Sequence, residues 1–160
     1  MMFNKKRRLG RKIQTIKVGE KLELTKKIED KDILLYLGLT DDANPIFIQH
    51  DYASQTPFQK PIVPQIMLAG IITSAISKYL PGPGSSVLKQ HLTFPKPLYH
   101  YGSLNLLLET IAVNESEHYV EIKVEGKDEF GTVVVEGIMG VCPPHELKSI
   151  AYNSGTFENF

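Results

Sequence analysis

Residues 64–79 are the most restrictive segment of the sequence, because their apolar side chains fall on nearly every side of a helix. A proline stands at position 64, where a first helical residue needs no backbone N–H. The run Pro81-Gly82-Pro83-Gly84 then ends the helix. A helix that is apolar on most sides has to be covered on most sides, so we expect a sheet to wrap around it. Its apolar members are Ile66, Met67, Ala69, Gly70, Ile71, Ile72, Ala75, Ile76 and Tyr79.

Strand patterns follow this helix over residues 86–95, 102–113, 119–127 and 132–142. The third pattern alternates most regularly, with Val120, Ile122 and Val124 set between polar neighbours. A turn over residues 127–131 joins the last two strands as a hairpin. Residues 21–28, before the helix, also alternate and suit an edge strand. One central helix with antiparallel strands predicts an α+β domain whose curved sheet wraps the helix.

A second helical pattern begins after a group of carboxylates. Glu29, Asp30 and Asp32 lead into an apolar-periodic run that closes at residues 40–42. Carboxylates at a helix start complement the positive end of the helix dipole. Three X-Pro pairs downstream predict an irregular connection over residues 40–63, because proline interrupts regular elements.

Charge and cysteine content exclude several classes of protein. Lys and Arg together number 18 and match 18 Asp and Glu, so the basic excess of a nucleic-acid-binding domain is missing. The apolar stretch over residues 62–80 carries Gln65 and Lys78, whereas a membrane span needs ~20 nearly uncharged residues. Cys142 is the only cysteine, so no disulfide forms within the chain, and a reducing, cytoplasmic location is expected.

The N-terminal residues are strongly basic, with six Lys and Arg side chains between Lys5 and Lys12. No apolar stretch of the ~7–15 residues that a signal peptide requires follows them. We expect residues 1–12 to be a solvated, flexible arm, with a phosphate-attracting patch as the alternative. One domain then covers residues 13–142, and residues 143–160 form a weakly patterned tail.

The connection before the long helix carries the most specific motif. It reads Tyr36-Leu37-Gly38-Leu39-Thr40-Asp41-Asp42-Ala43-Asn44-Pro45-Ile46-Phe47-Ile48-Gln49, followed by Tyr52-Ala53, Phe58 and Pro61-Ile62-Val63. This segment resembles the signature of the MaoC-like, (R)-specific enoyl-CoA hydratase family: Ser-Gly-Asp-x-Asn-Pro-Leu-His-x-Asp, then Ala, Phe and Ile-Val-His-Gly-Met. Residues 80–85 and 94–98 match the family's Leu-Pro-Gly turn and Phe-x-x-Pro-Val strand end. The resemblance extends over residues 15–142 and implies a hot-dog fold, with its central helix at about residues 64–80.

The resemblance also implies a reaction, the reversible addition of water to a 2-enoyl thioester of coenzyme A or acyl-carrier protein. In the family, a carboxylate and an imidazole hold the water and move its protons, and a backbone N–H at the start of the central helix stabilises the thioester oxygen. By position, Asp42 corresponds to the carboxylate, Asn44 to the family's Asn, and the backbone of Gln65 to the oxyanion donor. No cofactor and no metal are expected.

The family's histidine position is occupied by Phe47, which can neither donate nor accept a proton. Loss of a general acid or base costs ~10²–10⁴ in rate, so we expect a degenerate active site. His50, three residues further on, is the nearest replacement. His91 and His100, in or near the second strand pattern, are expected to be exposed or structural.

Asp42 has two interpretations. An Asp beside Asn-Pro orders a turn by accepting a hydrogen bond from the nearby backbone, whereas the family's Asp contacts water and ligand. Thr73 either holds the Asp42 carboxylate or bonds back within its own helix. Asn44, Phe47, Ile66 and Thr73 are expected to line the acyl site.

Three functions fit these residues. The first is a hydratase or dehydratase with an altered proton donor, which the retained Asp42 favours. The second is a non-catalytic acyl-thioester-binding subunit or sensor, such as the partner of an active hot-dog subunit in a heterodimer, which the missing histidine favours. The third is a thioesterase, because hot-dog relatives hydrolyse thioesters with a single carboxylate.

We expect the protein to be a homodimer or another even-numbered assembly, because a single curved sheet leaves an edge strand and an apolar face uncovered. Sedimentation of the purified protein at micromolar concentration should give at least twice the mass of one chain. A monomeric mass under those conditions would contradict this expectation.

Overall fold

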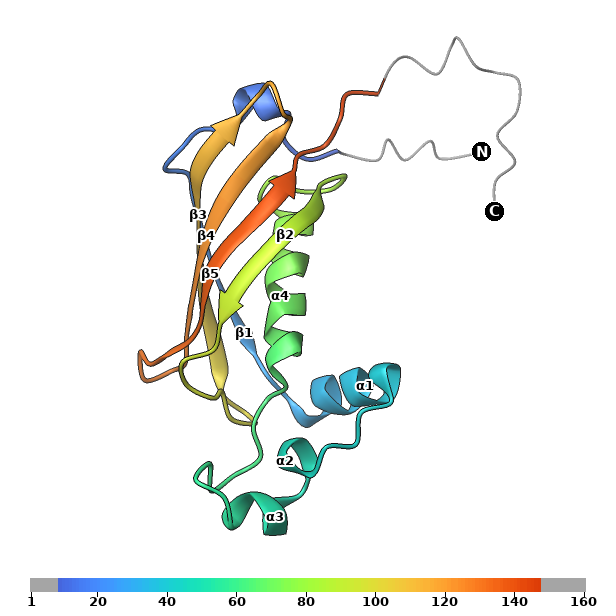
Figure 1. Cartoon of the computed structure of the whole chain (residues 1–160), viewed down its shortest axis with the longest axis vertical. Coiled ribbons are helices and arrows are strands. Elements are labelled where there is room, and N and C mark those ends of the chain that lie inside the picture. Colours follow the sequence, from blue (N-terminus) through green and yellow to red (C-terminus); the bar gives the residue numbers. More distant parts are fainter. Residues whose placement is uncertain (1–8, 148–160) are drawn as a thin grey trace, which may run out of the picture.

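The computed structural model describes residues 9–147, which contain one antiparallel sheet in the order β1-β3-β4-β5-β2. The sheet curves around the long helix α4 (Gln65–Lys78), as Figure 1 shows, so the expected α+β hot-dog fold is confirmed. The strands are β1 (Lys21–Lys27), β2 (Ser86–Thr93), β3 (Ser103–Asn114), β4 (Tyr119–Lys127) and β5 (Val133–Cys142). All five strand patterns expected from the sequence correspond to these strands, with β1 and β2 at the edges.

The core lies between α4 and the concave face of the sheet. On α4, Leu68, Ile72 and Ile76 are almost completely buried. Val120, Ile122 and Val124 of β4 are fully buried, as their alternation predicted. No helix within residues 9–147 is long and apolar enough to cross a membrane.

The acidic residues lie at the start of α1 (Asp30–Thr40), as expected. The backbone N–H of Glu29 donates to Asp32 Oδ2 at 3.1 Å, which closes the first turn. The helix ends where Asp41 takes a left-handed conformation, with φ 53°, and donates its N–H to the carbonyl of Leu37.

The expectation of an irregular connection over residues 40–63 was wrong for its first half, which forms two short helices. These are α2 (Pro45–Ile48) and α3 (His50–Ser54). Asn44 caps α2 by accepting a hydrogen bond from the N–H of Ile46 at 3.2 Å, and Pro45 takes the first helical position. Proline therefore starts a helix here, since the N–H that it lacks is not needed at that position.

The ends of the described chain pack onto the domain. Gly10 donates its N–H to the carbonyl of Pro83 at 2.7 Å, and a Cβ at Gly10 would clash with the Pro81 carbonyl oxygen. A short 3-10 turn, η1 (Ile13–Thr15), follows and buries Ile13. Residues 1–8 of the expected arm and residues 148–160 of the expected tail lie outside the described residues.

Thr110 on β3 is fully buried, and its hydroxyl has no hydrogen-bond partner within residues 9–147. We expect Thr110→Val to raise the free energy of unfolding by about 1–2 kcal/mol, because it removes an unsatisfied polar group at nearly constant volume. Denaturant titration measures this change. The matched control is Val124→Thr, which buries a new hydroxyl and should lower stability. A lower stability of Thr110→Val would show that the hydroxyl has a partner.

Candidate active site

The loop that carries the signature residues lies next to the start of α4 (Figure 1). The N–H of Ile62 donates to the carbonyl of Ile46 at 3.1 Å, so α2 is tied to the segment that leads into α4. The next N–H, of Val63, donates to the carbonyl of Leu98 at 2.8 Å and ties the same segment to the chain beyond β2. These two bonds hold the signature loop and the first turn of α4 at one end of the sheet.

Asp42 is half-buried, and one of its oxygens has a structural role. Its Oδ1 accepts the backbone N–H of Asn44 at 3.0 Å, which is the turn that an Asp beside Asn-Pro forms. The other oxygen, Oδ2, accepts no hydrogen bond within residues 9–147. Asn44 is exposed, and its side chain is used in capping α2. Asp42 therefore serves the turn through Oδ1 and still offers Oδ2 to a water molecule.

Gln65 is the first residue of α4, and Pro64 before it provides no side-chain cap. Within the described part of the chain, the backbone N–H of Gln65 has no hydrogen-bond acceptor. Such free N–H groups at a helix start carry the positive end of the helix dipole. The backbone therefore leaves a donor where the family signature expects an oxyanion to be stabilised.

Phe47, which we expect at the position of the family's histidine, is 9% exposed and belongs to the main hydrophobic core. Its ring packs in one cluster with Met67 of α4 and with core residues of the sheet. The space beside the signature loop is therefore filled by an apolar ring at this position, with no group that transfers protons.

Thr73 is committed to its own helix. Its hydroxyl donates to the carbonyl of Ala69 at 3.0 Å, one turn earlier in α4. Of the two roles expected for Thr73, the structure shows the bond within the helix. No hydrogen bond joins Thr73 to Asp42 among the described residues.

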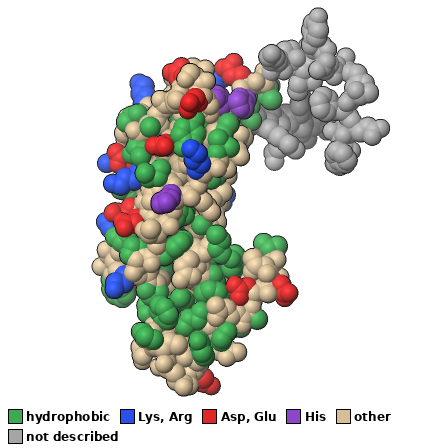
Figure 2. Space-filling view, viewed as in Figure 1, with side chains coloured by type: hydrophobic (Ala, Val, Ile, Leu, Met, Phe, Trp, Pro, Cys, Tyr) green, Lys and Arg blue, Asp and Glu red, His purple; other side chains and the backbone are tan. Residues whose placement is uncertain are grey.

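An apolar groove of about 380 Å³ runs between α1 and α4. Figure 2 shows the surface hollowed on this side, with hydrophobic side chains gathered where α1 to α3 project. The groove includes Ile66, which is 53% exposed, and its α1 side includes Leu35 and Leu39, which are 73% and 86% exposed. Its lining is Lys26, Asp32, Leu35, Tyr36, Leu39, Ile66, Met67, Gly70, Ile71 and Ser74.

Gly70 lies in the middle of α4 and lines this groove. A Cβ added there would meet no atom within 4 Å, so packing inside the chain does not require glycine. A glycine inside a helix costs roughly 0.5–1 kcal/mol relative to alanine. A glycine at this position leaves room for a ligand or a second chain to approach α4 from the groove.

The structure brings His50, the expected replacement, together with His100, although not with Asp42. His50 and His100 line a pocket of about 150 Å³ with Asp30, and Asp42 is not part of its lining. His100 Nδ1 lies 3.6 Å from an oxygen of Asp30, and His100 Nε2 is buried without a partner among the described residues. His91 is exposed on β2.

The Asp30 carboxylate in this pocket has a second neighbour. Tyr101 donates its hydroxyl to Asp30, and this hydrogen bond raises the pKa of Tyr101 above its ordinary value. Sequence reasoning missed the association of Asp30 with His100, because 70 positions separate them and no local pattern marks the pair.

Comparison with known proteins identifies the family of this chain. The family model described as MaoC like domain matches residues 12–131. An (R)-specific enoyl-CoA hydratase of Rhodospirillum rubrum is 31% identical over 135 residues, which cover 82% of this chain and 90% of that protein.

Two solved structures are similar over most of the chain. The (R)-hydratase of Aeromonas caviae superposes with a TM-score of 0.78 and 27% identity, covering 82% of this chain and 99% of that one. The R-hydratase PhaJ1 of Pseudomonas aeruginosa, in its unliganded form, gives a TM-score of 0.78 and 29% identity over 84% of this chain and 86% of that one. The chain therefore belongs to the MaoC-like family of hot-dog proteins.

Proposed function

We propose that this protein binds enoyl or 3-hydroxyacyl thioesters, of coenzyme A or acyl-carrier protein, and interconverts them by hydration and dehydration. The observation that carries the proposal is the N–H of Gln65 at the start of α4, which has no acceptor among the described residues. It stands beside the apolar groove lined by Ile66, on a segment tied to the Asp42 loop. An oxyanion donor, a carboxylate and an apolar channel are the three parts that this reaction needs.

The missing imidazole changes how the protons move. In the hydration direction, the water oxygen bonds to C3 of the enoyl thioester, and its proton passes to Asp42 Oδ2. The electron pair of the double bond moves onto the thioester carbonyl, and the Gln65 N–H stabilises the negative oxygen. The proton on Asp42 then passes to C2, which restores the carboxylate. One carboxylate thus replaces a pair of groups, and we expect a rate lower by ~10²–10⁴ than with both.

The groove along α4 supplies the place for the acyl chain. Its volume of about 380 Å³ is in the range of small-ligand sites, and Gly70 leaves space against the helix. A second copy of the chain would cover the exposed leucines of α1, Leu35 and Leu39, and close the groove. The dimer and the cytoplasmic location expected from the sequence belong to this proposal.

A second function is favoured by a different observation. Phe47 is buried in the core where a proton donor would stand, and Asp42 Oδ1 is engaged in a turn. Both features suit a subunit that holds an acyl thioester without converting it, as a sensor or beside an active hot-dog partner. Both functions use the same site, and only the first converts the bound thioester.

The test of hydration uses crotonyl-CoA and longer enoyl-CoAs, with the loss of conjugated-thioester absorbance as the readout. We expect slow turnover by the natural protein, and a fall of at least ~10²-fold in Asp42→Asn. This variant keeps an oxygen to accept the Asn44 N–H, so its stability should change little. Binding of acyl-CoA without turnover, measured by native mass spectrometry, would favour the non-catalytic function. A protein that neither binds acyl-CoA nor turns over enoyl-CoA would contradict both functions.

Phe47→His tests the missing proton donor. We expect kcat to rise at least tenfold with KM nearly unchanged, because a proton donor acts in the transition state. A stability loss of about 1–3 kcal/mol is expected, since the imidazole enters an apolar core position. Phe47→Leu is the control that alters the ring without adding a donor. Rapid turnover by the natural protein, unchanged in Phe47→His, would show that another group supplies the proton.

A further inference from the structure

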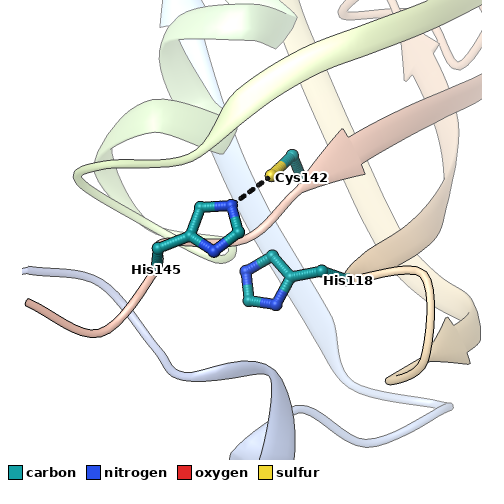
Figure 3. A group of neighbouring side chains, drawn as sticks. All are labelled: His118, Cys142 and His145. Carbon is teal, nitrogen blue, oxygen red and sulfur yellow. Dashed lines mark hydrogen bonds between the residues drawn. The ribbon is translucent and has the colours of Figure 1, made fainter.

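Three side chains with metal-binding atoms gather at the end of the sheet far from the start of α4. They are His118, in the turn between β3 and β4, Cys142, at the end of β5, and His145, three residues later (Figure 3). One nitrogen of each histidine and the cysteine sulfur all lie within 4.8 Å of one another. His118 and Cys142 are half-buried, and His145 is exposed.

The strand register brings these residues together. Val120 pairs with Val141 in the antiparallel β4–β5 ladder, so continuing the register places His118 opposite Pro143. His118 takes a left-handed conformation with φ 51°, and its N–H closes the turn onto Glu115 at 3.2 Å. Pro143 is buried, and its fixed φ limits how the following chain can leave the sheet. The backbone thus fixes the turn that carries His118 and the start of the chain segment that carries Cys142 and His145.

One distance in the cluster already suits a tetrahedral ion. Cys142 Sγ lies 3.5 Å from His145 Nε2. Zinc–sulfur and zinc–nitrogen bonds of about 2.3 and 2.0–2.1 Å at tetrahedral angles place such atoms roughly 3.6 Å apart. The ring of His118 stacks on that of His145, with centroids 3.9 Å apart and planes inclined by 13°. An imidazole binds an ion in its ring plane, so the two rings would have to leave this stack, and His118 would have to turn its Nδ1 toward Cys142, to complete a three-ligand set.

The hydrogen bonding of His118 determines which of its ring nitrogens could bind an ion. Its Nε2 lies 2.8 Å from the carbonyl oxygen of Pro143. A carbonyl only accepts, so this nitrogen carries the hydrogen and Nδ1 of the neutral ring keeps its lone pair. Histidines that bind metals commonly donate their other ring N–H to a carbonyl or carboxylate in this way, which fixes the tautomer and the ring.

We propose that His118, Cys142 and His145 bind a zinc ion, with water in the fourth position. Two imidazoles and one thiolate are a nitrogen and sulfur set, which suits zinc and not the oxygen-preferring calcium or magnesium. Binding releases the thiol proton to the solvent. The bound ion would join the chain after β5 to the β3–β4 turn. The site is independent of the proposed thioester chemistry, and it differs from the sequence-based expectation of no metal.

The experiment uses the untagged, full-length protein, stripped of metal by a chelator and kept reduced with a phosphine. Titration with Zn²⁺ against a chromophoric chelator should give one ion per chain, with a dissociation constant below ~1 µM. Co²⁺ in place of Zn²⁺ should show the thiolate charge-transfer absorption of a cysteine ligand. The thermal unfolding midpoint should rise with added Zn²⁺, because the ion binds the folded state.

The variants are Cys142→Ser, His145→Gln and His118→Asn. Asparagine is chosen for His118 because it tolerates the left-handed backbone. Each variant should weaken zinc binding by more than ~100-fold, since even groups outside the coordination sphere are commonly worth ~10–100-fold. His91→Gln changes an exposed histidine on β2 and should bind zinc like the natural protein.

His145 is exposed, so its replacement should leave folding intact, which circular dichroism checks. The proposal is overturned if the folded natural protein binds no stoichiometric zinc. It is equally overturned if Cys142→Ser and His145→Gln bind zinc as tightly as His91→Gln does, because the ion would then lie elsewhere.

Discussion

Burial of α4 determines how the other elements of the domain are arranged. Its apolar side chains point in most directions, and the sheet covers them with the inward faces of β2 to β5. Residues 9–147 leave the groove side of the helix, with Ile66 and Gly70, uncovered, and they leave the first N–H groups beyond Pro64 without acceptors. A wrapped helix leaves its backbone donors free at its start, so the fold itself fixes where a negatively charged oxygen can be stabilised.

The signature loop depends on the same arrangement. The bond from Ile62 to the carbonyl of Ile46 holds α2 against the segment that enters α4, and the turn made by Asp42 and Asn44 shapes the loop. These residues stabilise the loop whether or not the protein catalyses a reaction. Phe47 shows the consequence, because an apolar ring at this position becomes part of the core and strengthens packing where a histidine would serve the reaction.

Features with a local physical cause could be predicted from the sequence, and features that depend on distant contacts could not. The alternation of Val120, Ile122 and Val124 identified β4, and the flanking prolines and glycines bounded α4. The helix at Pro45 was missed because an X-Pro pair starts a helix as readily as it ends one. The pocket of Asp30 with His100, and the cluster at Cys142, join segments whose pairing only the sheet register reveals.

The proposed function requires that the start of α4 and the Asp42 loop form one acyl-thioester site. Binding of butyryl-CoA, which has no double bond to hydrate, tests it most directly through amide chemical shifts of the labelled protein. We expect saturable shifts of the Gln65 and Ile66 amides together with those of Asp42, Ala43, Asn44, Ile46 and Phe47. Shifts confined to the pocket of His50 and His100, or no shifts at all, would contradict it.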